Sequence, residues 1–176
     1  MVTLKMIEAC IKNDRLAQKE IYYHFLPKMN SVCKRYLKKS EDIDEALSEA
    51  FFIAFIKINQ LKEKLHFEAW LKRITINECL RLLKKQQSFN VYIDDMSLDF
   101  EDLTISDQLE EAYLLKVVNE LPEGCRAVFN LFVIEGYSHQ EIADMLMISV
   151  GTSKSQLNFA KKRLQEVLKN YQSNVI

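Results

Sequence analysis

Apolar residues recur every three or four positions through most of the chain, which is the spacing of an amphipathic helix. The first run predicts a short helix that Thr3 can cap, and the second predicts a longer helix that opens at Asp14. Pro27 lies inside the second run and should kink or split that helix. We expect Ser40 to cap a third helix and a fourth to run from about Phe67 to Gln86.

The periodicity then breaks and resumes at about Gln108. Residues 94–107 hold acidic side chains and no Lys or Arg, a composition typical of a solvated connector. Beyond it, a helix is expected as far as Glu120, and another begins with Pro122 in its first turn and stops at Gly136. The pattern therefore predicts an all-α chain of two small helical domains, 1–88 and 108–176, joined by a flexible acidic linker at 89–107.

Two further helices near the C-terminus each begin with a cap. Ser138 and Glu141 have the spacing of a capping box, and Ser149 can cap a long last helix. The short turn between the two helices predicts a helix-turn-helix, whose second helix enters the major groove of DNA. Met147 stands in that turn and would cost about 1 kcal/mol if it took a positive φ.

The last helix has one face suited to DNA. Short polar side chains near its start can reach base edges, and cations further along can reach phosphates. This face is predicted to carry Lys154, Ser155, Asn158, Lys161 and Lys162.

Charge is distributed unevenly along the chain, although the formal net charge is only -1. Residues 1–88 have a balance of +6, residues 89–125 of -9 and residues 126–176 of +2. Basic blocks that flank an acidic middle favour nucleic-acid contact at both ends.

Other kinds of chemistry find little support. The four cysteines form no C-x-x-C pair, the three histidines are far apart, and neither a nucleotide-binding loop nor a nucleophile with a nearby base is recognisable. We therefore expect no catalytic residue, metal, cofactor or small-molecule substrate. No run of about 18 apolar residues is present, so we expect a cytoplasmic protein without direct membrane insertion.

Specific residues in the second domain resemble a known family. The stretches are ELPEGCRAVF from Glu120, EGYSHQEIA from Glu135, ISVGTSKSQL from Ile148 and AKKRL from Ala160. In order and spacing they resemble region 4 of the extracytoplasmic-function (ECF) sigma factors of bacterial RNA polymerase, in the sigma-70 family. In the first domain, DIDEALSEAF from Asp42 and FEAWLKRITIN from Phe67 resemble region 2 of the same family.

The resemblance implies a sigma factor that directs promoter-specific transcription initiation, with region 2 at 1–88 and region 4 at 108–176. It implies as partners the polymerase core (β′ clamp and β flap), promoter DNA and an anti-sigma factor. Recognition of the −35 element is assigned to Thr152, Lys154, Ser155, Gln156, Asn158, Lys161 and Lys162. Recognition of the −10 element is assigned to Lys62, Lys64, His66, Arg73, Asn77 and Arg81. Core docking is assigned to Asp42, Asp44, Glu45 and Glu49.

Aromatic residues of the first domain are mostly assigned to the core. Trp70 could stack a base, but its helical spacing with Phe67 and Ile74 favours burial. Phe51, Phe52 and Phe55 are expected to be mostly buried as well.

The sequence also departs from the family pattern. Gly is usual in the turn where Met147 stands, and Ser48 replaces a frequent Gln. Ser153, Gln156 and Phe159 stand where an apolar residue, Arg and Arg are common. The −35 sequence therefore cannot be carried over from other members.

Two other functions stay open from the residues alone. One is a stand-alone helix-turn-helix regulator whose N-terminal helices sense a ligand or form a dimer. The other is an all-α interaction adaptor that never touches DNA. The region 2 resemblance argues against the first, and the basic face of the last helix argues against the second.

Overall fold

The computed structural model of the chain describes residues 4–85 and 116–174, with side chains as far as Val167. These residues form helices and turns, with no β-strand among them, as the hydrophobic pattern predicts. The chain divides into two compact units, unit 1 (Met1–Gln86) and unit 2 (Gln87–Ile176). The linker predicted at 89–107 and the start of the helix expected from Gln108 lie outside the described residues.

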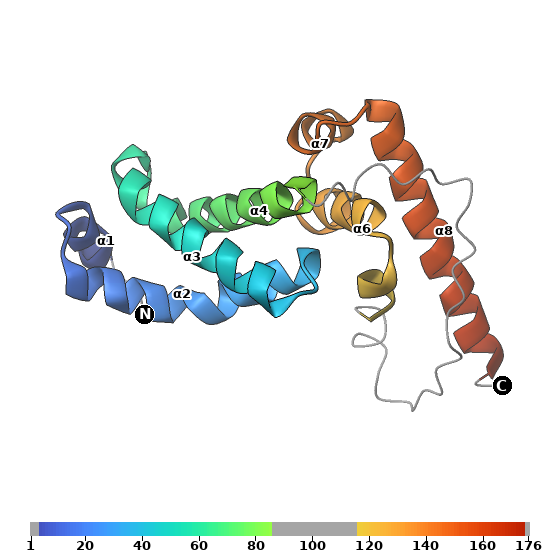
Figure 1. Ribbon diagram of the computed structural model, residues 1–176, viewed down its shortest axis with the longest axis horizontal. Coiled ribbons are helices and arrows are strands. Elements are labelled where there is room, and N and C mark those ends of the chain that lie inside the picture. The colour runs from blue at the N-terminus through green and yellow to red at the C-terminus, as the bar shows by residue number, and fades with distance from the viewer. Residues whose placement is uncertain (1–3, 86–115, 175–176) are drawn as a thin grey trace. The chain divides into compact units, whose positions relative to one another are not determined.

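Unit 1 is a helical bundle (Figure 1). Its described elements are α1 (Leu4–Ile11), α2 (Arg15–Tyr36), α3 (Ser40–Lys57), the 3-10 turns η1 (Ile58–Gln60) and η2 (Lys64–His66), and α4 (Phe67–Lys85). Helices α2 and α4 run in the same direction, because Phe25 packs on Phe67 with ring centroids 5.4 Å apart and Met29 contacts Thr75 one to two turns later. Helix α3 runs back in the opposite direction and packs against both.

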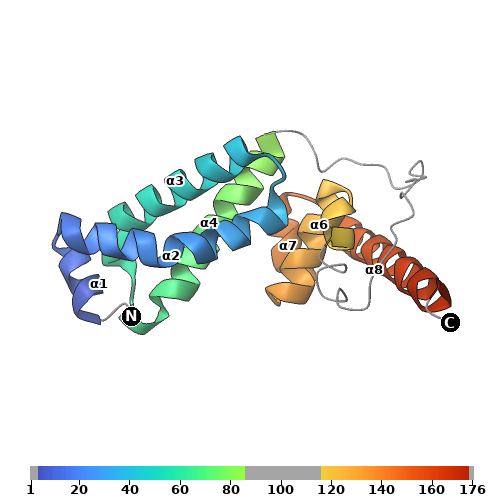
Figure 2. The same cartoon turned by 90° about the horizontal axis from the view of Figure 1, so that it is seen from below.

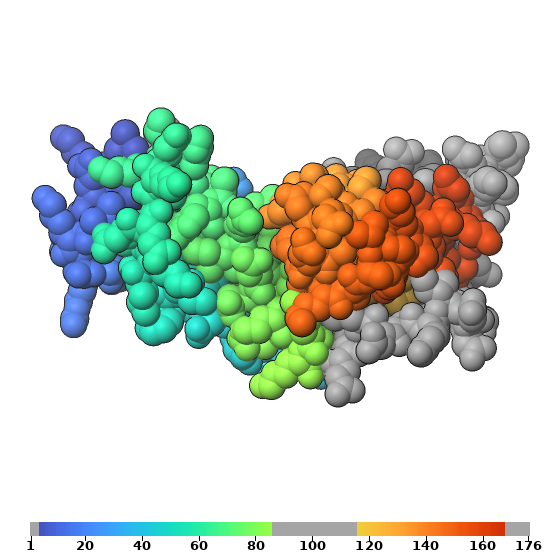
Figure 3. Space-filling model, turned by 90° about the horizontal axis from the view of Figure 1, so that it is seen from above, coloured from blue at the N-terminus to red at the C-terminus, as the bar shows by residue number. Residues whose placement is uncertain are grey.

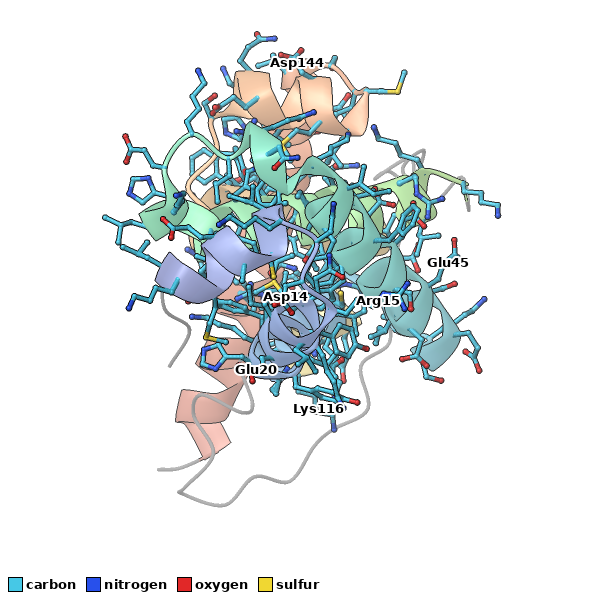
Figure 4. The ribbon with its side chains drawn as sticks, turned by 90° about the vertical axis from the view of Figure 1, so that its left-hand side faces the viewer. Asp14, Arg15, Glu20, Glu45, Lys116 and Asp144 are labelled. Carbon is cyan, nitrogen blue, oxygen red and sulfur yellow. The ribbon has the colours of Figure 1, made fainter. Side chains whose placement is uncertain are left out.

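The helix starts in unit 1 agree only partly with the sequence prediction. Helix α2 begins where the pattern opens, and Asp14 caps it, because its carboxylate accepts hydrogen bonds from the backbone N–H groups of Leu16 and Ala17 at 2.8 and 3.1 Å. Figure 4 looks onto this end of α2. Ser40 is the first helical residue of α3 and Lys39 is the N-cap, which makes no side-chain capping bond. The prediction that Ser40 caps this helix was therefore wrong by one position.

Pro27 does not split α2, which runs unbroken from Arg15 to Tyr36. Pro27 and Tyr23, whose carbonyl loses its helical partner, both lie on the exposed side of the helix. Solvent can satisfy that carbonyl, so the helix tolerates the proline. Ser31 Oγ donates to the Pro27 carbonyl oxygen at 3.1 Å and adds a bond across the same turn.

Apolar side chains from all four helices fill the core of unit 1. Fully buried members include Ile21, Met29, Tyr36, Phe67, Leu71, Ile76 and Leu83. Trp70 is half-buried and its ring lies 5.9 Å from that of Phe67. Cys10, Cys33 and Cys79 are buried free thiols, as expected for scattered cysteines.

Unit 2 consists of shorter elements followed by one long helix (Figure 2). Residues 116–120 are helical, and α6 (Glu123–Phe129), the π-helical turn η4 (Asn130–Ile134), α7 (His139–Leu146) and α8 (Val150–Asn174) follow. The sequence predicted one helix from Pro122 to Gly136; Pro122 is instead the N-cap of α6, and the helix widens into η4. Gly136 ends this segment with φ 78°, a conformation that glycine adopts without strain.

Arg126 is a buried cation at the centre of unit 2. Its side chain is 1% exposed, and Nη1 donates to the carbonyl oxygens of Asn119 at 3.0 Å and Leu121 at 3.4 Å. Burial lowers the pKa of the guanidinium below its usual value, and nearby Glu123 partly opposes the shift. Arg126 therefore holds the end of the preceding helix against α6.

Candidate functional site

Helices α7 and α8 form the predicted helix-turn-helix. Ser138 and Glu141 make the predicted capping box: the Ser138 backbone N–H donates to Glu141 Oε2 at 2.8 Å, and the Glu141 N–H donates to Ser138 Oγ at 3.3 Å. Ser149 Oγ accepts from the Thr152 N–H at 2.9 Å and so caps α8, also as predicted. Between the helices, Met147 adopts the left-handed conformation with φ 58° and ψ 43°.

The exposed face of α8 holds most of the residues assigned to DNA. Lys154, Ser155, Asn158, Lys161 and Lys162 are all exposed. Figure 3 shows α7 and the first half of α8, in orange, at the surface of unit 2. Thr152 is half-buried, and its hydroxyl shares a hydrogen bond with Ser149 Oγ at 2.8 Å. This face presents hydroxyl, amide and ammonium groups over about two turns, a set that can contact base edges and phosphates.

Gln156 is the exception, and its assignment to DNA was wrong. Its side chain is only 1% exposed, because position 156 shares the inner face of α8 with Ser153, Leu157 and Ala160. The amide lies against Gly124 so closely that a β-carbon at position 124 would be 2.9 Å from Gln156 Nε2. Positions 153, 156, 157 and 160 have the i, i+3, i+4, i+7 spacing of one helix face, and the apolar Leu157 and Ala160 mark that face as buried. This spacing could have revealed the burial of Gln156.

Phe159 also faces inward and not toward solvent. It is half-buried and packs on the apolar cluster that contains Val118, Leu121, Cys125 and Ala160. The two positions where arginines are common in the family, 156 and 159, thus hold side chains that complete the interior of unit 2.

Helix α3 exposes a stripe that begins acidic and ends apolar. Asp44 and Glu45 are exposed, whereas Asp42 and Glu49 are half-buried. Glu45 lies at the outer edge of α3 (Figure 4). Further along the helix, Phe52 and Ile56 are exposed by 59% and 61%.

Phe52 was expected to be mostly buried, and this expectation was wrong. Phe51 is buried and Phe55 half-buried, but Phe52 lies three residues after Glu49 on the outer side of α3. Three nearby phenylalanines cannot all face one direction on a helix. The sequence prediction therefore did not recognise Phe52 and Ile56 as the apolar end of the α3 stripe. Their helical spacing from Glu45 and Glu49 already places them on the same side of the helix.

On α4, Arg73, Asn77 and Arg81 are exposed and follow one another at four-residue intervals. Arg81 is already engaged: Nε donates to Glu78 Oε2 at 2.6 Å and Nη2 to Glu45 Oε1 at 3.1 Å. These hydrogen bonds raise the pKa of Arg81 above its usual value, Glu78 contributing most. One residue assigned to the −10 element thus contacts one assigned to polymerase docking.

The turn before α4 holds the other residues assigned to the −10 element. Lys62 and His66 are exposed, and Lys64 is half-buried with Nζ 2.7 Å from Glu8 Oε1. That pairing lowers the pKa of the Glu8 carboxyl group. His66 Nδ1 lies 3.3 Å from Glu63 Oε2. Lys64 also lines a cavity of about 270 Å³ together with Leu4, Ile7, His24, Phe25, Leu65, Phe67 and Glu68.

Metal and membrane chemistry find no support in the described part of the chain. Residues 4–85 and 116–167 contain no cluster of three His, Cys, Asp or Glu side chains that could hold a metal ion. Among the described helices, none combines the length and the hydropathy that a bilayer span requires.

Comparison with known proteins gives matches in both units. The family model "Sigma-70 region 2" matches residues 21–89, and "Sigma-70, region 4" matches residues 111–164. The ECF RNA polymerase sigma factor SigW of Bacillus subtilis is 27% identical over 97% of this chain and 98% of its own length. The ECF sigma factor SigM of Mycobacterium tuberculosis is 26% identical over 93% and 83%, and the ECF sigma-E factor of Escherichia coli 24% identical over 90% of each chain.

Solved structures share the fold. CnrH, in complex with the cytosolic domain of CnrY, has a TM-score of 0.52 at 20% identity and covers 95% of this chain and 97% of its own. The sigma factor RpoE of Bartonella quintana, in complex with the anti-sigma factor NepR, has a TM-score of 0.50 at 24% identity, with coverages of 86% and 96%.

Proposed function

The chain belongs to the ECF family of RNA polymerase sigma factors, and from this premise we propose how its two units bind the polymerase core and read a promoter. The observation that carries the proposal is that region 2 and region 4 matches occur in family order, and the second unit holds a capped helix-turn-helix. Sigma factors are initiation factors without chemistry of their own. The proposal therefore assigns binding roles only.

We assign −35 recognition to the exposed face of α8. Lys154, Ser155 and Asn158 lie within its first turns, where a recognition helix meets base edges. Lys161 and Lys162 lie one to two turns later and are exposed, which suits contact with phosphates. Thr152 remains a candidate at the start of the helix, whereas the buried Gln156 is left out.

We assign −10 recognition to α4 and the turn before it. Opening of a promoter exposes unpaired bases, which proteins hold with cations for the backbone and with pockets or stacking faces for the bases. Exposed Arg73, Asn77 and Lys62 supply polar contacts, and Lys64 stands beside the cavity described above. His66 is exposed at the end of η2. Arg81 is better assigned to holding α3 on α4, because two carboxylates already engage it.

We assign core docking to the α3 stripe. Its acidic residues would face a basic surface of the polymerase clamp, and Phe52 and Ile56 would add apolar contact next to them. Charged and apolar groups in one patch give both orientation and buried area. Exposed aromatic and aliphatic side chains that lie together on a helix are typical of an interaction surface.

The docking assignment is tested by charge reversal on α3. The variant Asp44→Lys with Glu49→Lys leaves the Arg81–Glu45 pair intact, and we expect it to lose co-elution with core polymerase. The matched control is Glu20→Lys with Asp144→Lys, which reverses two exposed acids on other helices. Co-elution of the α3 variant at the wild-type level, with an unchanged far-UV signal, would contradict the assignment.

We further propose control by an anti-sigma factor in the cytoplasm, where the polymerase acts. Two proteins of the same fold were solved as complexes, CnrH with CnrY and RpoE with the anti-sigma factor NepR, and this supports the proposal. The alternative is a stand-alone helix-turn-helix regulator. Transcription in vitro with purified core polymerase separates the two, because only a sigma factor makes the core initiate at specific sites.

A further inference from the structure

His139, the first residue of α7, contacts two other elements of unit 2. Its Nδ1 shares a hydrogen bond of 2.9 Å with Ser153 Oγ on α8. Its ring stacks on Phe132 in η4, with centroids 4.6 Å apart and planes at 26°. One imidazole therefore joins α7, α8 and η4.

The bond to Ser153 is partly buried, since His139 is half-buried. The Ser153 side chain is completely buried, and a buried hydroxyl is costly unless it finds a hydrogen-bond partner. His139 provides that partner. This accounts for a hydroxyl at position 153, where the family commonly has an apolar residue.

The stack on Phe132 leads back to α8. Lys161 Nζ lies 5.7 Å from the centroid of the Phe132 ring, within the range of a cation–π contact. Lys161 follows Ser153 by eight residues, about 12 Å along a helix axis. Contacts through His139 and Phe132 thus hold α8 at two points, which fixes its direction as well as its position.

We propose that His139 is a positioning residue for −35 recognition. This inference rests on the proposed function of α8. The hydrogen bond to Ser153 fixes the turns of α8 that carry Ser155 and Asn158. The stack on Phe132 fixes the position of the ring that Lys161 contacts. Without the imidazole, Lys161 would have to be ordered by the DNA itself, and its phosphate contact would weaken.

A double-mutant cycle tests this coupling with holoenzyme and a promoter duplex. We expect Lys161→Ala to lower promoter affinity about fivefold, the order of one phosphate contact, and His139→Ala to lower it at least as far, because it also releases Ser153. Combined, they should lower it little further than His139→Ala alone, because His139→Ala already loses the ordered Lys161 contact. Lys162→Ala is the matched control: it removes the neighbouring exposed cation, and its effect should multiply with that of His139→Ala.

A second background separates positioning from folding. His139→Phe with Ser153→Ala keeps a ring on Phe132 and leaves no buried hydroxyl unpaired. In this background Lys161→Ala should again cost about fivefold. If His139→Ala alone loses the wild-type helix signal, the proposal is judged in this double variant. A fivefold loss of promoter affinity on adding Lys161→Ala supports the proposal, and no loss overturns it.

Two outcomes contradict the inference in different ways. If the fold-losses of promoter affinity caused by His139→Ala and Lys161→Ala multiplied, as those of His139→Ala and Lys162→Ala should, His139 would not act through Lys161. The inference would then be overturned, while the proposed function of α8 would stand. If wild-type holoenzyme showed no dependence on the −35 element, the proposed function would fail, and the inference with it.

Discussion

The two units bury polar side chains to different degrees. In the described residues of unit 1, Thr75 and Glu78 are the buried polar side chains, and the rest of the core consists of aliphatic, aromatic and thiol groups. Unit 2 buries Arg126, Asn130, Ser153 and Gln156 in a smaller set of elements. The polarity of a residue therefore predicts solvent exposure well in unit 1 but poorly in unit 2.

The units also differ at their left-handed residues. Asn13 has φ 62° in the turn before α2, and Met147 has φ 58° in the helix-turn-helix. Asparagine adopts this conformation readily, but for methionine it is strained. Unit 2 thus carries both more buried polarity and more backbone strain, and we expect it to respond differently to substitution.

The two largest expected effects are core substitutions, one in each unit, and the first is the loss of the buried cation in unit 2. Arg126→Ala removes a filled volume and leaves the carbonyl groups of Asn119 and Leu121 without their donor, which should destabilise unit 2 by about 3 kcal/mol. Urea unfolding measures this, because the single tryptophan, Trp70, reports on unit 1 and far-UV circular dichroism reports on both units. The circular dichroism transition should broaden toward lower urea while the Trp70 transition stays in place.

The converse variant lies in unit 1. Leu71→Ala opens a fully buried site and should move the Trp70 transition by about 2–5 kcal/mol. An equal shift of the Trp70 transition by Arg126→Ala would show that the two units unfold together.

A smaller effect of opposite sign is expected at Gln156. Its buried Oε1 has no hydrogen-bond partner in the described part of the chain. Gln156→Leu keeps the volume and removes the unpaired oxygen, so it should stabilise unit 2 by about 1 kcal/mol. Promoter binding should be unchanged; a lost −35 interaction would restore Gln156 to the DNA-contacting set.

Relief of backbone strain should be smaller again. Met147→Gly should stabilise unit 2 by about 0.5–1 kcal/mol, since glycine adopts positive φ without a steric penalty. Asn13→Gly is the matched control and should change stability by only a few tenths of a kcal/mol. Thermal unfolding of both variants measures the difference, and a larger gain at Asn13 than at Met147 would contradict the strain argument.

The smallest difference concerns two of the buried thiols, Cys10 from unit 1 and Cys125 from unit 2. Burial raises the pKa of Cys10 and of Cys125 to about 11. A raised folded-state pKa gives stability that is present below the unfolded value of about 8.5 and is lost as pH rises toward 11. Cys10→Ala and Cys125→Ala should each flatten the fall in unfolding free energy over this window, and unchanged slopes would argue against buried, neutral thiols.

The sequence predicted the elements better than their orientations. The all-α class, the start of a helix at Asp14, the Ser138 capping box and the Ser149 cap follow from local chemistry, and the structure has them. Gln156 and Phe52 were placed on the wrong sides because residue type was preferred to helical position. The π-helical turn at Asn130–Ile134 depends on packing against other elements, which no local pattern encodes.

Substitutions on the exposed face of α8 test the central claim most directly. With holoenzyme, Ser155→Ala or Asn158→Ala should change the preference among −35 variants by about 1–3 kcal/mol at one base pair. Lys162→Ala should weaken all promoters about equally and lower the salt slope by about one. If Lys162→Ala changed sequence preference while Ser155→Ala and Asn158→Ala did not, α8 would not read the −35 element in the way proposed.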